Sequence, residues 1–523
     1  MSFSESAGAD LRESPPRGLV LRELVDRGRR RLDRCTDASL MDLAEDALWR
    51  ERQRLERARP LPGEILRLDA LARAVVRGSR ADRQTAALAL VSAWADEVHG
   101  HFDKRAFSFV TRVAPRAIHS LLTAPGLATE HTVGGSHKRI VLQGDIQSLV
   151  ALAQEATLVL VPTHVSNLDS PLVGLALHQA GLPPFLYGAG LNLFSNKWLG
   201  WWMRRLGAYT VDRTKKSRLY LDLLKDYSVR AVAQGQHSLF FPGGTRSRNG
   251  AIETVVKKGL LGTGVTGWQE SISLGHKRDV YFVPLTLSYQ LVLEAGTLMD
   301  DHLAEVGKQR YIITDDESAA PTTVLSFLRR IVDLDATAVL HFGQPMDIVG
   351  KPVPGTVADR RDASRDRLRL VTDRQGNVEV DPQRDAVYSG QLAARLAESW
   401  PKYAVWMATH AAAWAAWTAL ERAAGTTDPF RLARLPAERR ELPRLVVLEG
   451  LARGLAAANR ATARGDGTLS LPESPADVLD AAVNRFARWH TTPALSVRGD
   501  TVFVENPRLC LYYRNRSPWA EPS

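Results

Sequence analysis

The sequence predicts an α/β domain that follows a helical N-terminal domain and precedes a mainly helical C-terminal region. Two observations support this fold class. Short apolar runs alternate with segments of helical spacing through the middle of the chain, which is the element order of α/β domains. Most of these runs lack hydrophobic–polar alternation, as expected of strands that helices cover on both faces. A chain of 523 residues can hold two or three compact units, and we place them at residues 1–135, 136–425 and 426–523.

The elements are expected in the following order. Residues 16–125 mix charged and apolar residues at helical spacing, and residues 126–138 interrupt this pattern with Gly and Ser. Strands are then expected at residues 157–162, 184–187, 208–211, 238–241, 280–287 and 336–342. The polar segment 351–366 contains two prolines and is expected to be a surface loop or linker. A helical region follows, and residues 495–504 are expected to form a short hairpin.

The composition is that of a globular protein with an anionic partner. Apolar residues make up 45% and charged residues 24% of the chain, which excludes a disordered chain. The net charge of +10 and the pI near 9.7 favour a phosphate metabolite, an acidic lipid surface or a nucleic acid, without choosing among them. The two cysteines, Cys35 and Cys510, form no close-spaced metal or redox motif. We expect a protein of the reducing cytosol, since the N-terminal residues also lack a secretory pattern.

The longest uncharged run, residues 403–420, is nearly long enough to cross a bilayer. It is rich in Ala and Thr and is interrupted by His410. We expect a buried or interfacial helix here, with a membrane span as the alternative.

A histidine and a carboxylate follow the first long apolar strand. The run 157–163 is typical of a buried strand, and Ser170-Pro171 is typical of a helix start, so His164 and Asp169 fall in the turn between them. Side chains five positions apart meet only where the backbone bends, and the turn supplies that bend. A carboxylate on one ring nitrogen leaves the other free to take a proton from a hydroxyl. The pair indicates a general base, and the alternative is a capping Asp beside a loop His.

A basic cluster between residues 204 and 218 holds six basic residues against one acid. Within it we choose Arg213 for a fixed contact with an anion, because its planar fork matches phosphate oxygens. For Lys215, Lys216 and Arg218 we expect a solvated basic face.

A second basic segment begins at the Gly-Gly bend that ends in Gly244. Glycines let a backbone approach an anion closely, and Arg246, Ser247 and Arg248 can then donate hydrogen bonds to it. A phosphate monoester is a natural occupant. The alternative is an ordinary turn.

Pro284 interrupts the strand expected at 280–287. Proline is awkward in a central ladder because it has no amide hydrogen, so the pattern indicates an edge strand or a bend beside a pocket. Residues 262–267 match a dinucleotide-binding fingerprint but lack a clear preceding strand. The chain has no phosphate loop ending in Gly-Lys-Ser/Thr and no Gly-x-Ser-x-Gly elbow, so acyl-enzyme chemistry has no obvious nucleophile.

Taken in order, these segments resemble the four blocks of the glycerolipid acyltransferases, and specifically the glycerol-3-phosphate acyltransferase branch. The similarity covers roughly residues 157–343, with a fainter echo in the closing Tyr512-Tyr-Arg-Asn. The matching segments include Val161-Pro-Thr-His-x-x-x-x-Asp169, Ala189-Gly-Leu-Asn192, Arg204-Arg-Leu-Gly-Ala-Tyr with Arg213-Thr, Gly244-Thr-Arg-Ser-Arg-Asn-Gly250, and Val283-Pro-Leu with Tyr289 and Leu293-Glu-Ala-Gly-Thr297.

The resemblance implies a mixed, mostly parallel sheet flanked by helices, and direct acyl transfer from a thioester of coenzyme A or acyl carrier protein. His164 would be the base on the glycerol hydroxyl and Asp169 its orienting carboxylate, with no metal and no cofactor. The acceptor's phosphate would lie against Arg213, Arg246, Ser247 and Arg248, and the substrate and acyl pocket would include Gly244, Thr245 and Pro284. The acceptor would be the sn-1 hydroxyl of glycerol 3-phosphate or, alternatively, lysophosphatidate. An anionic membrane, contacted peripherally from the cytoplasm, is the expected surface, with no nucleic acid.

One position departs from the family pattern. The third block usually has a Glu where this chain has Gly243. Either Glu253 or another acid compensates, or the acceptor differs, or activity is poor. Gly243 is also the best support for a different class of function, a noncatalytic lipid-surface or nucleic-acid binding protein on the same scaffold. The absence of aromatic residues interleaved with the basic ones argues against nucleic acid.

A tryptophan cluster offers a candidate membrane contact. Trp198, Trp201 and Trp202 lie next to Arg204 and Arg205, a composition typical of an interfacial patch. The alternative is core packing.

Overall fold

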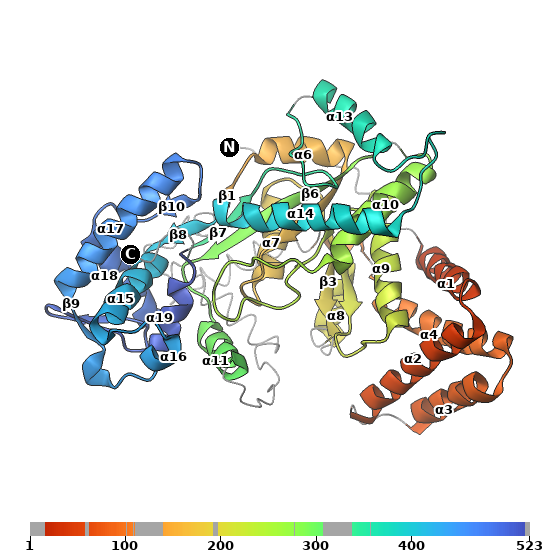
Figure 1. Ribbon diagram of the computed structural model, residues 1–523, viewed down its shortest axis with the longest axis horizontal. Helices are drawn as coiled ribbons and strands as arrows, with labels where there is room; N and C mark the ends of the chain where they lie inside the picture. Colours follow the sequence, from red (N-terminus) through yellow and green to blue (C-terminus); the bar gives the residue numbers. More distant parts are fainter. Residues whose placement is uncertain are drawn as a thin grey trace.

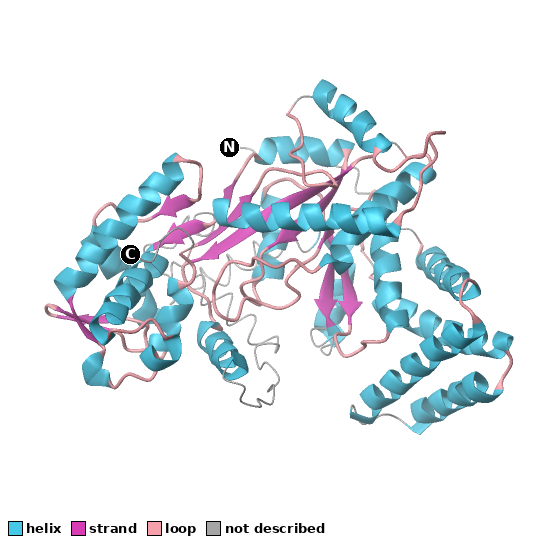
Figure 2. Cartoon of the chain, viewed as in Figure 1, coloured by secondary structure: helices cyan, strands magenta, loops and turns pink. Residues whose placement is uncertain are grey.

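The computed structural model describes residues 16–57, 62–100, 102–107, 109, 140–191, 197–276, 278–306, 337–355 and 357–517. Figures 1 and 2 show a twisted sheet in the middle of the molecule, with helical units on either side formed by the two ends of the chain.

The central sheet has seven strands in the order β1-β7-β6-β2-β5-β3-β4. They are β1 Ile140–Gln143, β2 Thr157–Pro162, β3 Leu186–Gly190, β4 Ala208–Val211, β5 Ser238–Leu239, β6 Val280–Tyr289 and β7 Ala338–Phe342. All neighbouring strands are parallel except β6 and β7. The predicted α/β fold with a mixed, mostly parallel sheet is therefore confirmed. The sequence pattern misses the short β1 and places β3 two residues too early.

Helices flank the sheet and make up most of both ends. Their bounds are α1 Arg17–Asp33, α2 Asp37–Arg57, α3 Pro62–Arg77, α4 Arg80–Val98, α6 Ile146–Glu155, α7 Asp169–Gln179, α8 Lys197–Arg205, α9 Arg218–Ala233, α10 Lys258–Ser273, α11 Ala295–Val306, α13 Val357–Arg369, α14 Pro382–Lys402, α15 Ala408–Ala424, α16 Pro429–Leu432, α17 Arg444–Ala463, α18 Pro475–Trp489 and α19 Pro507–Arg514. Outside the main sheet lie β8 Val405–Met407, β9 Glu441–Pro443, β10 Thr468–Ser470, β11 Ser496–Arg498 and β12 Thr501–Phe503.

The loop predicted at residues 351–366 is wrong from Val357 onward, where α13 begins. Both prolines precede the helix. Within it, Arg365 pairs with Asp362 and Arg369 with Asp366, each three positions apart on an exposed surface. Such spacing supports an exposed helix whose composition alone resembles a loop.

Helices cover both faces of the sheet, which explains the unbroken apolar strands. Along β2, Leu158 and Leu160 belong to a core shared with α6 and α7. Val159 and Val161 belong to a second core, shared with α10 and α14. Figure 1 shows α14 lying across the sheet.

Pro284 lies in β6, which is a central strand, so the edge-strand prediction is wrong. On the side of β6 that faces β7, Phe282 exchanges two hydrogen bonds with Met346, and Gly343 donates to the Pro284 carbonyl. The regular pairing with β7 begins only at Leu285, opposite Phe342. The missing amide hydrogen therefore falls where the chain turns out of β7, next to the first residue of the regular ladder.

The N-terminal helices share a core with the central domain. Buried apolar residues of α1 to α4 form one cluster with residues of α9. Trp94 of α4 packs edge-on against Tyr220 of α9, with ring centroids 5.6 Å apart. Ion pairs between Arg27 and Glu270 of α10, and between Glu23 and Arg230 of α9, cross the same boundary.

The C-terminal unit buries the uncharged run of residues 403–420. Most of this run forms β8 and α15, and α15 packs against α17, α18 and α19. Within the described residues, no helix has both the length and the apolar character that crossing a bilayer requires. The predicted hairpin at residues 495–504 is confirmed as β11 and β12, which pair in antiparallel fashion.

Candidate active site

The turn between β2 and α7 brings His164 and Asp169 together. β2 ends at Pro162, and α7 begins at Asp169, one residue before the expected start. The Nδ1 atom of His164 lies 2.7 Å from Oδ2 of Asp169. An ionised carboxylate can only accept, so Nδ1 carries the hydrogen and Nε2 of the neutral ring is left to take a proton. The contact thus leaves Nε2 available to accept a proton.

Asp169 is completely buried and accepts hydrogen bonds at both oxygens. Its Oδ2 accepts from the backbone N–H groups of Val165 at 2.6 Å and Ser166 at 3.0 Å, as well as from the imidazole. Its Oδ1 accepts from the hydroxyl of Tyr289 at 2.6 Å. These contacts fix the Asp169 carboxylate in the position from which it orients the ring.

The imidazole is also held by its face. The rings of His164 and Phe241 stack with centroids 4.3 Å apart and an interplanar angle of 28°. The His164 side chain keeps 13% of its surface accessible. The ring is therefore fixed in orientation but can still be reached by a substrate.

We expect Tyr289→Phe to lower turnover by roughly tenfold, because the substitution removes one neutral donor to Asp169 and leaves three. Burial raises the pKa of Tyr289 well above its ordinary value, so the hydroxyl is a donor at every pH of assay. A hydrogen bond to a charged group contributes about 1.5–3 kcal/mol, of which only part acts on the rate. Steady-state kinetics measure this change. A variant as inactive as one that lacks His164 would show that the Tyr289 hydroxyl contributes more to the reaction than one hydrogen bond to Asp169.

Arg246 is linked to the His164 turn through Glu294. The Glu294 carboxylate accepts from Asn167 N at 2.9 Å and from the Ser166 hydroxyl at 3.0 Å, both in the turn after His164. Its Oε1 also lies 3.3 Å from Nη1 of Arg246. The backbone N–H of Ser247 donates to the His164 carbonyl at 2.8 Å, which fixes the arginine segment directly beside the base.

Arg213 lies close enough to Arg246 for their charges to interact. The pKa of Arg213 is below its ordinary value, because its guanidinium is partly withdrawn from water and because the positive charge of Arg246 is near. The residue as a whole remains exposed. Two neighbouring guanidinium groups that repel each other form a favourable place for an anion.

The other predicted site residues are placed as follows. Arg248 is directed toward α11, where it donates to Glu305 at 2.5 Å. The Ser247 hydroxyl donates to the Ala251 carbonyl at 2.6 Å, inside the turn. Gly244 has a φ of +75°, which favours glycine, and Thr245 is exposed. Pro284 is buried in β6, next to Gly343. The roles predicted for these residues remain predictions.

A family model described as Acyltransferase matches residues 145–288, which contain His164, Asp169, Arg213 and Arg246. The chain contains an acyltransferase domain. A glycerol-3-phosphate acyltransferase of Baumannia cicadellinicola subsp. Homalodisca coagulata is 28% identical to the chain over 195 residues, which are 37% of this chain and 22% of that protein. The match thus spans about a fifth of the relative's length. The predicted resemblance to the glycerolipid acyltransferases is confirmed for this part of the chain.

Among solved structures, the 1-acyl-sn-glycerophosphate (LPA) acyltransferase PlsC of Thermotoga maritima is similar to this chain at 14% sequence identity. The superposition covers 56% of this chain and 92% of that one, with a TM-score of 0.26.

The acyltransferase domain contains a second carboxyl group beside the base. Oε1 of Glu253 accepts from the backbone N–H of His164 at 3.0 Å, while Oε2 is buried without a hydrogen-bond partner among the described residues. A Cβ atom at Gly243 would lie 2.8 Å from Oε1 of Glu253. The Glu253 carboxyl therefore takes up the space that a side chain at position 243 would need.

Burial raises the pKa of Glu253 to about 8, and the nearby charge of Asp169 adds to this rise, while the His164 N–H and Arg516 oppose it. Between the ordinary pKa near 4.5 and the folded value near 8, the folded protein holds a proton that the unfolded chain has lost. Glu253 therefore makes the protein less stable as the pH rises across this window.

The side chain in Glu253→Gln cannot ionise. We therefore expect the free energy of unfolding of the variant, relative to that of the wild type, to increase between pH 4.5 and pH 8 by on the order of a few kcal/mol. Chemical denaturation at several pH values measures this difference. A difference that stays constant across the window, or that falls, would show that Glu253 is already ionised in the folded protein.

The sequence pattern indicates no role for Glu294 or Tyr289, although both fall within the segments that carry the resemblance. Their contacts with Ser166 and Asp169 join residues 128 and 120 positions apart. Such pairings follow from the sheet, in which β6 lies next to β2, and no local pattern reveals them.

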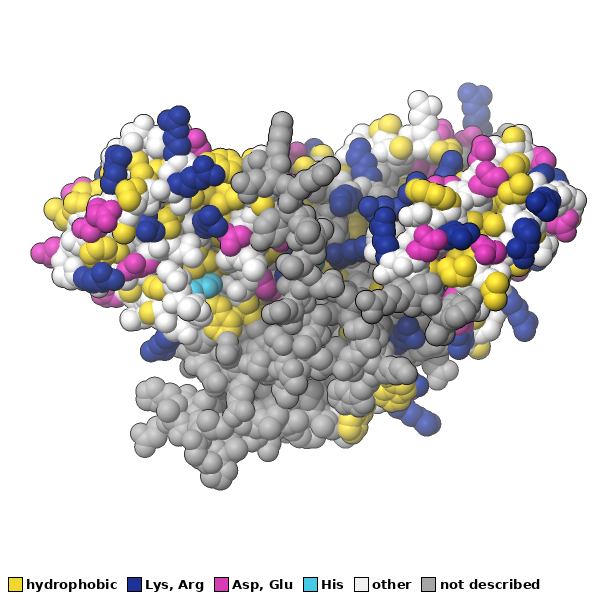
Figure 3. All heavy atoms as spheres, turned by 90° about the horizontal axis from the view of Figure 1, so that it is seen from below, with side chains coloured by type: hydrophobic (Ala, Val, Ile, Leu, Met, Phe, Trp, Pro, Cys, Tyr) yellow, Lys and Arg dark blue, Asp and Glu magenta, His cyan; other side chains and the backbone are white. Residues whose placement is uncertain are grey.

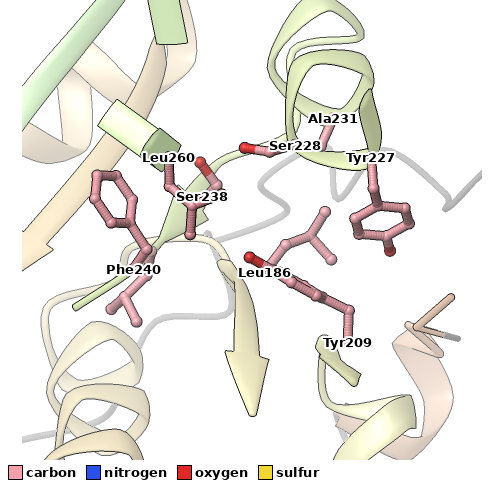
Figure 4. A pocket seen from close by; sticks show the side chains of 9 residues that line it. Leu186, Tyr209, Tyr227, Ser228, Ala231, Ser238, Phe240 and Leu260 are labelled. Atoms are coloured by element: carbon pink, nitrogen blue, oxygen red, sulfur yellow. The ribbon is translucent and has the colours of Figure 1, made fainter. Parts of the chain in front are cut away.

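A small cavity lies elsewhere in the acyltransferase domain, between the sheet and helices α9 and α10. It is lined by Leu186, Tyr209, Tyr227, Ser228, Ala231, Ser238, Leu239, Phe240 and Leu260, as Figure 4 shows. None of the predicted site residues lines it. The candidate active site is therefore defined by the contacts around His164.

Proposed function

We propose that this chain transfers a fatty acyl group from a thioester of coenzyme A or acyl carrier protein to the sn-1 hydroxyl of glycerol 3-phosphate, giving lysophosphatidate. The proposal is supported by the connection of the His164–Asp169 pair to Arg246 through Glu294. The same network thereby holds a base and a group that can bind an anion. A phosphorylated alcohol needs both, one for its hydroxyl and one for its phosphate.

The proposed reaction is a direct transfer. Nε2 of His164 takes the proton of the acceptor hydroxyl while the oxygen attacks the thioester carbonyl. The carbon–sulfur bond then breaks, and the imidazolium returns the proton to the thiolate that leaves. Asp169 stabilises the imidazolium and keeps Nδ1 protonated. No resident metal or cofactor has a part in this proposal.

Arg213 and Arg246 are proposed to bind the phosphate of the acceptor. A phosphate monoester carries about −1.5 to −2 charges at neutral pH, which offsets the repulsion between the two guanidinium groups. Arg246 keeps its contact with Glu294, because a guanidinium has five N–H donors. The phosphate would thus place the acceptor's hydroxyl near the imidazole.

The proposal is tested by incubating purified protein with glycerol 3-phosphate or lysophosphatidate and with either type of thioester. Mass spectrometry of the products identifies acceptor and donor together. Lysophosphatidate from glycerol 3-phosphate supports the proposal, and phosphatidate from lysophosphatidate alone would assign the second acylation instead. No acylated product from any combination would contradict acyltransferase activity.

The loss of the usual Glu at position 243 is proposed to be compensated by Glu253. Its carboxyl contacts the backbone of His164 from a space that is available only because residue 243 is glycine. The acid that the family has at position 243 is then supplied by position 253, and the activity is retained.

An anionic membrane surface is proposed to contact α8. Trp201 is 47% exposed, and the guanidinium of Arg205 lies 3.7 Å from its ring centre. Trp202 stacks on Phe109, which is 54% exposed. Aromatic rings beside basic residues are typical of helices that lie at the membrane interface. The enzyme would then release its lipid product at the cytoplasmic face of a bilayer.

Sedimentation with vesicles that contain anionic lipid tests this surface. A basic residue near such a surface contributes about 1 kcal/mol, so we expect Arg205→Ala to lower the partition coefficient about fivefold and Trp201→Ala to lower it further. Trp49 of α2 is 61% exposed, and Trp49→Ala is the matched control. Equal binding of all three variants and the wild type would show that α8 is the wrong surface.

The face seen in Figure 3 offers no support for nucleic-acid binding. Its coloured Lys and Arg side chains lie interspersed with Asp and Glu, without a continuous basic stripe among them. Nucleic-acid surfaces are typically basic along the path of the phosphate backbone.

A further inference from the structure

We propose that the N-terminal helices position Arg213 for the anionic group of the acceptor, through an ion-pair cluster that holds the loop between β4 and α9 on both sides of this residue. This inference rests on the proposed function and gives a task to the part of the chain that carries none of the acyltransferase resemblance. Lys215 and Asp212 are the positioning residues, and Glu97, Glu51 and Arg54 hold them.

Lys215 anchors the loop on the C-terminal side of Arg213. It is 5% exposed, so the expectation of a solvated basic residue is wrong for Lys215, although Lys216 and Arg218 are exposed as expected. Its Nζ forms an ion pair with Glu97 of α4 and lies 3.9 Å from Oε1 of Glu51 of α2.

Aromatic rings enclose the same ammonium group. Nζ of Lys215 lies 5.7 Å from the ring centre of Trp94 of α4 and 5.4 Å from that of Tyr220 of α9. A cation within about 6 Å of an aromatic face is attracted to it. The lysine is therefore fixed by two carboxylates and two rings, of which three groups belong to the N-terminal helices.

Asp212 anchors the loop on the N-terminal side of Arg213. Its Oδ1 accepts from the backbone N–H of Thr214 at 2.9 Å and from the Thr214 hydroxyl at 2.6 Å, which closes the turn around Arg213. Its Oδ2 lies 3.9 Å from Nε of Arg54 of α2. The backbone N–H of Asp212 also donates to the Tyr220 hydroxyl at 2.9 Å.

The two anchors belong to one cluster, because Arg54 also donates to Glu51 at 2.6 Å. Cations and carboxylates thus alternate from Asp212 through Arg54, Glu51 and Lys215 to Glu97. A buried charge that loses its partner is costly, so the cluster favours one arrangement of the loop. Arg213 is the residue between the anchors, and its own side chain remains exposed and near Arg246.

Steady-state kinetics of Lys215→Met and Glu97→Gln test the proposal. Methionine keeps the length of the buried side chain, and Glu97 keeps 29% exposure, so the Gln variant is the milder disturbance. We expect the KM for glycerol 3-phosphate to rise about five- to tenfold in Lys215→Met and less in Glu97→Gln, with kcat at saturating acceptor and the KM for the thioester unchanged. In the double variant the rise in KM should not exceed that of Lys215→Met, since both substitutions remove the same ion pair.

Arg27→Met is the matched control. Arg27 of α1 binds Glu270 of α10 across the same boundary between the N-terminal helices and the acyltransferase domain, without a contact to the loop among the described residues. We expect wild-type kinetics from it. An equal rise in KM for Arg27→Met, or a fall in kcat with unchanged KM for Lys215→Met, would overturn the proposal in favour of a general structural role.

Calorimetric titration with inorganic phosphate separates this inference from the proposed function, because it requires no acyl transfer. We expect the wild type and Arg27→Met to bind phosphate alike, and Arg213→Ala and Lys215→Met to bind it more weakly. If the wild type acylates no acceptor, and this order of phosphate affinities still holds, the proposed function fails and the positioning role stands. Equal phosphate affinity in wild type and folded Lys215→Met, or no phosphate binding by the wild type, would overturn the positioning role.

Discussion

Replacing His164 by alanine is expected to lower the rate of acyl transfer by about a hundredfold to ten-thousandfold, which is the usual contribution of a positioned general base. The side chain is held by Asp169 at Nδ1 and by Phe241 on its face, so that Nε2 has one orientation. Alanine leaves Asp169 with three donors, among them the hydroxyl of Tyr289, and the fold is expected to persist.

Release of free thiol from the thioester measures this loss, and circular dichroism reports the fold. His178 lies exposed near the end of α7, the helix that follows the His164 turn, and His178→Ala serves as the control with unchanged rate. A folded His164→Ala variant with wild-type turnover would remove the imidazole from the mechanism.

The second large effect is expected from Asp169→Asn, which should lower turnover by about a thousandfold to ten-thousandfold. Replacing the carboxylate that orients a catalytic histidine by its amide lowers kcat by up to about 10⁴. The amide oxygen can still accept from Val165 and Ser166, and the Tyr289 hydroxyl can rotate to accept from the amide nitrogen. The structure would then persist without the negative charge that stabilises the imidazolium.

Turnover and thermal unfolding of Asp169→Asn are measured together. The expected result is a large loss of kcat with a folded protein. A variant that keeps more than a tenth of the wild-type rate would show that the charge of Asp169 has little effect on the chemistry, and that the carboxylate serves the turn alone.

The local part of the candidate site follows from sequence because its determinants are local. An apolar run that ends at Pro162 and a helical pattern that begins near Ser170 place His164 and Asp169 in one turn. The chain must bend there, so the two side chains meet. The central strands are also predictable, since strands covered on both faces are apolar throughout.

The residues that complete the site come from contacts that no local pattern encodes. Glu294 and Tyr289 reach the turn because β6 pairs with β2, and Lys215 is buried because α2 and α4 pack over its loop. For Pro284, the sequence pattern predicts a position in the sheet that is wrong. The expectation of an edge strand assumes an unbroken ladder, whereas the ladder between β6 and β7 begins only after this residue.

Comparison of wild type and His164→Ala shows whether His164 acts in acyl transfer to glycerol 3-phosphate. The product to detect is isotopically labelled lysophosphatidate, formed from labelled glycerol 3-phosphate and an acyl thioester. We expect labelled product from the wild type, in equal amount to the thiol released, and at least a hundredfold less from the folded variant. Equal amounts of product from both proteins, or thiol release by the wild type without any acylated glycerol phosphate, would contradict this expectation.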